Sequence, residues 1–139
     1  MDGPDVTATI KAPRIPHTLY HYTCTDHGER GIRNAGVLRP NKHFLLDRPV
    51  VWLTDLDEPD PWVLGLTRKV LCCDRTAVRC AVDTNHPAIN LGDIEPWTTY
   101  ARYMPRTARE ILEDVGMPMH WYVTEKPLVV SEITARGNA

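Results

Sequence analysis

The clearest alternation of side chains along the chain lies in TAVRCAVD, residues 76–83. In an extended chain Val78, Cys80 and Val82 would lie on one face and Arg79 on the other, between small apolar neighbours. This period of two is typical of a β-strand with one face on a hydrophobic core.

Four other stretches also predict strands. TLYHYT combines Leu19 with neighbours of high strand propensity, and PVVWLTD is a β-branched and aromatic run between a proline and an acidic turn. MHWYVTE and LVVSEIT read as two more strands, with Lys126 and Pro127 at their junction. These four segments span residues 18–23, 49–55, 119–125 and 128–134.

Helical signals are fewer. TAREILEDVG, residues 107–116, has the form of a capping box in Thr107 and Glu110, and Gly116 ends the pattern. Residues 98–104 are a possible helix before Pro105.

A short helix is also predicted between Thr25, a potential cap, and Gly36, which can adopt the left-handed conformation that ends helices. Residues 62–73 fit either a short helix or an irregular segment, because Gly65 weakens both interpretations.

The elements together predict an α+β fold with a split mixed or antiparallel sheet and two or three short helices. A chain of 139 residues that is 42% hydrophobic is long enough for one core and short for two. We expect a loosely ordered arm over residues 1–16, which contains three prolines, and a single domain over residues 17–136.

The overall charge gives little indication of a partner. The formal net charge is −2, so the field of the whole chain does not favour tight non-specific binding of DNA. No run approaches the roughly 18 apolar residues of a membrane span, and the first residues are acidic where a secretory signal is basic. We therefore expect a cytoplasmic protein with no membrane partner and with its four cysteines reduced.

Three kinds of chemistry find little support. Metal ligands usually come in closely spaced pairs, and only His21 with Cys24 and the adjacent Cys72 and Cys73 approach that spacing, so we expect no metal site. Ser131 is the only serine and no nucleophile elbow surrounds it. No glycine-rich phosphate loop or dinucleotide fingerprint is present.

Two motifs together resemble a known family. In HYTCTDHGERGIRNAGVLRP a strand histidine is followed by a helix and by Ile32, Gly36 and Leu38, and VVWLTD places Trp52 inside a strand that ends at Asp55. This pairing resembles the ADP-ribosyltransferase-like fold, which includes poly-ADP-ribose polymerases, diphtheria-type toxins and RNA 2'-phosphotransferase. Small free-standing members of that fold are often toxins or factors in bacterial and phage conflict.

The resemblance implies a site for NAD between the first two strands. His21 would hydrogen-bond a ribose hydroxyl, the backbone near Tyr22 and Thr23 would contact the nicotinamide amide, and Trp52 would stack on the nicotinamide ring. Thr54 would complete the wall of the cleft. An imidazole that both donates and accepts, and a flat indole, suit such a ligand.

The chain departs from this family at the late strand, where members usually carry a glutamate. His120 or Trp121 stands at the closest match, and Glu125 and Glu132 follow it. The resemblance implies catalytic roles for His21 and for His120, Glu125 or Glu132 in transferring ADP-ribose from NAD to an unknown protein or nucleic-acid acceptor.

Two alternatives stay open. An RNA 2'-phosphotransferase-like enzyme or RNA-end-binding protein on the same fold would use Arg75 or Arg79 to bind a phosphate. A catalytically inactive interaction module would have kept the fold and lost the carboxylate.

Overall fold

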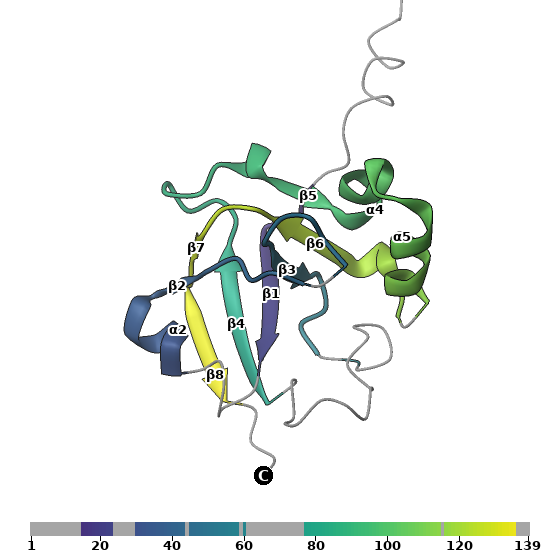
Figure 1. Ribbon diagram of the computed structural model, residues 1–139. Coiled ribbons are helices and arrows are strands. Elements are labelled where there is room, and N and C mark those ends of the chain that lie inside the picture. Colours follow the sequence, from purple (N-terminus) through teal and green to yellow (C-terminus); the bar gives the residue numbers. More distant parts are fainter. Residues whose placement is uncertain are drawn as a thin grey trace, which may run out of the picture.

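A six-stranded antiparallel sheet with the order β5-β6-β3-β1-β4-β8 forms the centre of the molecule (Figure 1). Its strands are β1 (Thr18–Thr23), β3 (Val51–Thr54), β4 (Val78–Asp83), β5 (Ile94–Pro96), β6 (Trp121–Thr124) and β8 (Glu132–Ala135). A second, antiparallel sheet pairs β2 (Val37–Leu38) with β7 (Leu128–Val129). The computed structural model describes residues 15–23, 30–43, 45–58, 60, 77–114 and 116–135.

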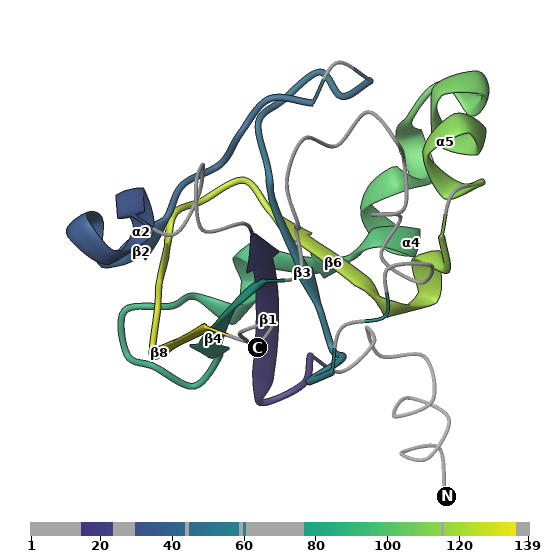
Figure 2. The same cartoon turned by 90° about the horizontal axis from the view of Figure 1, so that it is seen from below.

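The helices lie at two sides of the sheet. Figures 1 and 2 both place α4 (Trp97–Tyr100) and α5 (Arg106–Glu113) together on one side and α2 (Arg30–Ala35) on the other. Short 3-10 turns, η2, η3 and η4, lie at Leu91–Asp93, Ala101–Tyr103 and Pro118–His120. The predicted α+β class with few helices is confirmed.

The strand registers define the two faces of the sheet. Tyr20 of β1 pairs with Thr54 of β3, and Thr54 pairs with Trp121 of β6. Because side chains alternate along a strand, these residues share one face with Trp52, which we call the tryptophan face. His21 and the side chains in register with it lie on the opposite face, which we call the histidine face.

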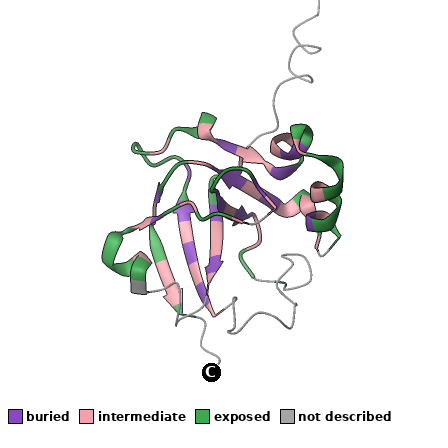
Figure 3. Ribbon diagram, in the orientation of Figure 1, coloured by how far each residue is buried: buried purple, intermediate pink, exposed green. Residues whose placement is uncertain are grey.

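Each face has its own hydrophobic core, and the buried residues concentrate on the central strands in Figure 3. The core on the histidine face includes Leu19, Leu53 and Val82, together with Leu38 and Leu128 from the small sheet. The core on the tryptophan face instead joins the sheet to α4 and α5, through residues that include Trp97, Leu112, Trp121 and Val123.

Several strand predictions are confirmed. Residues 18–23 form β1, and the predicted two-faced strand at residues 76–83 is found as β4, in which Val78, Cys80 and Val82 are buried. The predicted strands at residues 49–55 and 119–125 are found as the shorter β3 and β6.

Residues 128–134 do not form one strand. β7 pairs with β2 in the small sheet, whereas β8 pairs with β4 in the large sheet, so the chain changes sheets between Val129 and Glu132. The short strands β2 and β5 carry no alternation long enough to recognise.

The predicted capping box at Thr107 and Glu110 is wrong. α5 begins one residue earlier, at Arg106, after Pro105, which fixes its own φ near the helical value and leads into the first turn. Glu110 therefore accepts a hydrogen bond from Arg106 Nε at 2.9 Å. A helix close to the possible one at residues 98–104 is found as α4 and η3.

Some predictions lie outside the described residues. These are the cap at Thr25, the segment 62–73, most of the arm 1–16, and Cys24, Cys72, Cys73 and Arg75. Cys80 is buried on β4.

Candidate active site

His21 lies on the central strand β1, and its ring is partly buried. Its Nδ1 is 2.8 Å from the backbone carbonyl oxygen of Trp52. Because a carbonyl only accepts, Nδ1 donates this hydrogen bond, and in the neutral ring Nε2 keeps its lone pair. Burial lowers the pKa of His21, although the hydrogen bond to Trp52 acts in the opposite direction. The neutral imidazole therefore offers Nε2 as an acceptor.

A second histidine is held in the same way. His120 Nδ1 is 2.8 Å from Asp55 Oδ1, and the two side chains are 31% and 29% exposed. The pairing of Thr54 with Trp121 brings them together, because Asp55 follows β3 and His120 precedes its antiparallel partner β6. The carboxylate accepts, so Nδ1 carries the proton and Nε2 is left for another partner.

His21 projects from the histidine face, and extending the register of β3 with β6 by one residue puts Asp55 and His120 on the same side of the sheet. Extending the strand registers places His120 two strands away from His21. It lies two residues before Tyr122, the residue of β6 that is level with His21. With strands about 4.8 Å apart and about 3.3 Å per residue, the Cα atoms of His21 and His120 are roughly 12 Å apart. Leu53 of β3, which is buried in the core of this face, lies between the two positions.

Tyr122 of β6 lies on the same face, level with His21 and two residues from His120. It packs against the core of the histidine face, and burial raises the pKa of its hydroxyl, with a further rise from the charge of Asp55. The hydroxyl therefore stays protonated at neutral pH.

The Trp52 side chain lies on the other face. Its ring centroid is 5.0 Å from that of Trp97, 5.9 Å from that of Trp121 and 6.4 Å from that of His43. The motif suggests that the side chains of Trp52 and His21 line one cleft. The structure instead places them on opposite faces of the sheet. Only the Trp52 backbone contacts His21.

Three other expected binding residues also belong to the tryptophan face. Tyr22 donates its hydroxyl hydrogen bond to the Leu56 carbonyl at 2.8 Å, and Thr54 Oγ1 accepts from the Leu56 amide at 3.3 Å. Arg79 donates to the Asp57 carbonyl at 2.7 Å and lies over the Tyr20 ring. Arg79 is therefore engaged away from the two histidines.

Thr23 and Glu132 complete the set of expected site residues. Thr23 is partly buried at the end of β1, on the histidine face. Glu132 is exposed on β8, an edge strand separated from β3 by β4 and β1. It does not approach His120, which precedes β6.

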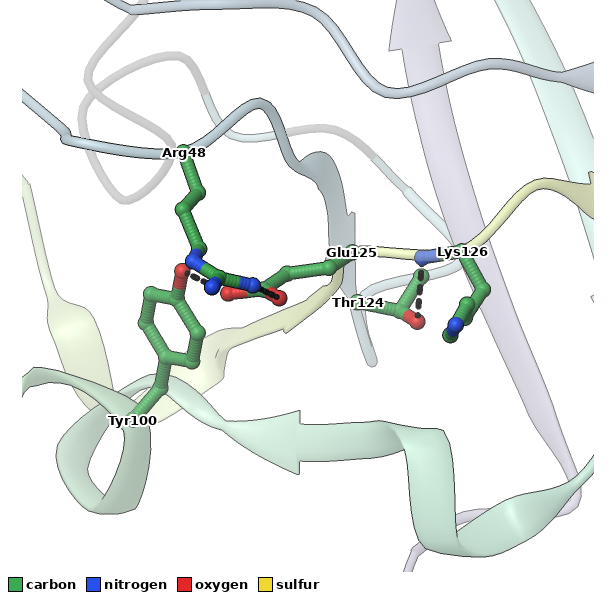
Figure 4. Close-up of polar contacts among 5 residues, drawn as sticks. All are labelled: Arg48, Tyr100, Thr124, Glu125 and Lys126. Atoms are coloured by element: carbon green, nitrogen blue, oxygen red, sulfur yellow. Dashed lines mark hydrogen bonds and ion pairs between the residues drawn. The ribbon is translucent and has the colours of Figure 1, made fainter.

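Glu125 is held in a separate network at the opposite end of β6 from His120 (Figure 4). Tyr100 donates to Glu125 Oε2 at 2.7 Å, and Arg48 donates to Oε1 at 3.0 Å. The Tyr100 hydrogen bond, followed by Arg48, lowers the pKa of Glu125 against the opposing effect of burial. Burial and then Glu125 raise the pKa of Tyr100, so its hydroxyl remains a donor.

This network predicts a specific response to acid. A carboxyl with a lowered pKa stabilises the fold above its ordinary pKa, about 4.3, and loses that contribution as the pH falls through its pKa in the folded protein. Glu125→Gln should therefore remove part of the loss of thermal stability that wild type shows between neutral pH and pH 3.5. At neutral pH the substitution should cost about 1 kcal/mol or less.

Glu132→Gln is the matched control, because this exposed glutamate makes no side-chain hydrogen bond or ion pair within the described part of the chain. Its pH profile of melting temperature should follow wild type. Parallel profiles for Glu125→Gln and wild type would show that the network has no energetic role.

Asp55 is the candidate site residue that the sequence did not single out, since it resembles the other acidic residues of an exposed turn. Its position one residue after a strand is visible in the sequence, but its contact with His120 depends on which strands pair. No group of three His, Cys, Asp or Glu side chains in the described ranges is placed to hold a metal ion. Within those ranges no helix has the length and apolar character needed to cross a membrane.

Comparisons with known proteins return no relative: no protein-family model matches the chain, and no curated protein or solved structure is significantly similar to it.

Proposed function

We propose that the chain binds NAD on the histidine face and transfers its ADP-ribose to a macromolecule. The observation that carries this proposal is the hydrogen-bonded pair of His120 and Asp55, on the same face as His21. This pair stands at the start of the late strand, where the resemblance calls for a carboxylate.

The chemistry of these groups suits the donor half of the reaction. Breaking the bond between ribose and nicotinamide develops positive charge on the ribose, and a fixed carboxylate nearby lowers the energy of that state. Asp55 supplies the carboxylate that the late strand lacks, and His120 holds it in place. His21 Nε2 can accept a hydrogen bond from a ribose hydroxyl, because its Nδ1 proton is already committed to Trp52.

Thermal unfolding with NAD tests the proposal. A ligand at ten times its Kd that binds only the folded state adds about 1.4 kcal/mol of stability. The melting temperature of wild type should therefore rise by several degrees in saturating NAD. His21→Ala should lose this rise, since it removes the acceptor Nε2.

His86→Ala is the matched control. His86 is exposed, in the turn after β4, and its Nδ1 accepts only a local hydrogen bond from the Ala88 amide. This variant should keep the full NAD-dependent rise. Each variant is compared with itself without NAD, so a change in its intrinsic stability does not obscure the result. No rise in wild type, or an equal rise in His21→Ala, would contradict the proposed site.

A further inference from the structure

We infer that His120, oriented by Asp55, is the general base of the transfer and that the acceptor is a hydroxyl group on a polypeptide. This inference rests on the proposed function and names its acceptor. It stands on the geometry of the pair: an imidazole whose Nδ1 proton is held by a carboxylate at 2.8 Å leaves Nε2 as a proton acceptor.

A base at this position distinguishes between acceptor types. A carboxylate acceptor enters already ionised, needs no base and would be repelled by Asp55. A hydroxyl is a weak nucleophile until a neighbouring base takes its proton. The pair is therefore matched to an alcohol and mismatched to an acidic side chain.

The proton and electrons balance without another reactant. The hydroxyl oxygen forms a bond to the ribose carbon as the bond from that carbon to the nicotinamide nitrogen breaks. The electron pair of the broken bond neutralises the ring nitrogen, and nicotinamide leaves uncharged. The hydroxyl proton moves to His120 Nε2, and Asp55 stabilises the resulting imidazolium.

Local charge favours a polypeptide over a nucleic acid. Residues 49–67 contain Asp55, Asp57, Glu58 and Asp60 and no lysine or arginine. Asp57, Glu58 and Asp60 are exposed directly after Asp55, and Arg79 of β4 donates to the Asp57 carbonyl, so several acidic side chains stand against one basic side chain at this turn. Binding to nucleic acid depends on neutralising its phosphates with basic side chains, which this segment does not supply.

Among the residues that the structure describes, the titratable groups near His120 are Asp55, which follows β3, and Tyr122 of β6, with His21 two strands away. Among described elements, α4 packs against η4, and its titratable side chain, Tyr100, is hydrogen-bonded to Glu125.

The first experiment measures nicotinamide release from NAD. His120→Ala should lower the rate by about 10²- to 10⁴-fold, and added imidazole should restore part of it, because a free base can enter the vacated space. Asp55→Asn should also lower the rate. His86→Ala should behave as wild type.

The outcomes separate the two proposals. If His120→Ala keeps the NAD-dependent rise in melting temperature but also releases nicotinamide at the wild-type rate, the base assignment is wrong and the NAD site stands. A loss of rate that imidazole does not restore also contradicts the base assignment. If wild type gains no stability from NAD, the proposed function itself fails.

The second experiment compares acceptors with labelled NAD. It uses a basic peptide with one serine, the same peptide with glutamate in place of the serine, and an oligoribonucleotide. Label on the serine peptide alone, stable to neutral hydroxylamine, is expected. Label on the glutamate peptide or on the oligoribonucleotide, or nicotinamide release with no label on any of the three, would overturn the assignment of the acceptor.

Discussion

Trp97→Ala is expected to lower the free energy of unfolding by about 3–5 kcal/mol. Trp97 is fully buried, and its ring centroid lies 5.0 Å from that of Trp52 and 6.0 Å from that of Trp121. Its Nε1 also donates to Glu113 Oε2 of α5 at 2.8 Å. Truncation would leave a cavity between α4 and the sheet and remove the donor that ties α5 to this core.

Urea unfolding provides the measurement. Small domains are stable by only about 5–15 kcal/mol, so the midpoint of Trp97→Ala should fall well below that of wild type. Trp97→Phe should fall between them, since it keeps a ring but not the indole donor. Tyr103→Ala is the control, because this side chain is 86% exposed, and it should change stability by about 1 kcal/mol or less. A midpoint for Trp97→Ala close to wild type would show that the helices do not depend on this core.

Local patterns were enough to find much of the sheet. The alternation at residues 76–83 and the strand-forming run at residues 18–23 correspond to β4 and β1, because side-chain direction along a strand is fixed by neighbouring residues alone. The prediction of one strand at LVVSEIT was wrong for the same reason. A local apolar run does not indicate that β7 and β8 pair with different strands in different sheets.

The site shows the same limit more sharply. A polar residue inside β1 was enough to select His21, and the motif at the late strand drew attention to His120. Asp55 could not be joined to His120 from the sequence, because 65 positions separate them and their contact depends on the pairing of β3 with β6. The face on which Trp52 lies also depends on register, and a shift of one residue reverses it.

The position of the Trp52 side chain on the tryptophan face leads to a second large expected effect, that of Trp52→Ala. The substitution should lower the free energy of unfolding by about 2–4 kcal/mol, because it removes the ring that packs on Trp97 and Trp121. It should nevertheless leave the NAD-dependent rise in melting temperature, since the Trp52 carbonyl that orients His21 belongs to the backbone and is kept.

His21→Ala should show the opposite pattern of ligand response, with the rise lost. Melting curves of each variant are recorded with and without NAD, from well below the melting temperature of that variant to above it. They measure the change in stability and the response to NAD in one experiment. If Trp52→Ala folds and yet loses the response to NAD while His21→Ala keeps it, the ligand binds on the tryptophan face. In that case the carboxylate available to it would be Glu125, held by Tyr100 and Arg48, in place of Asp55.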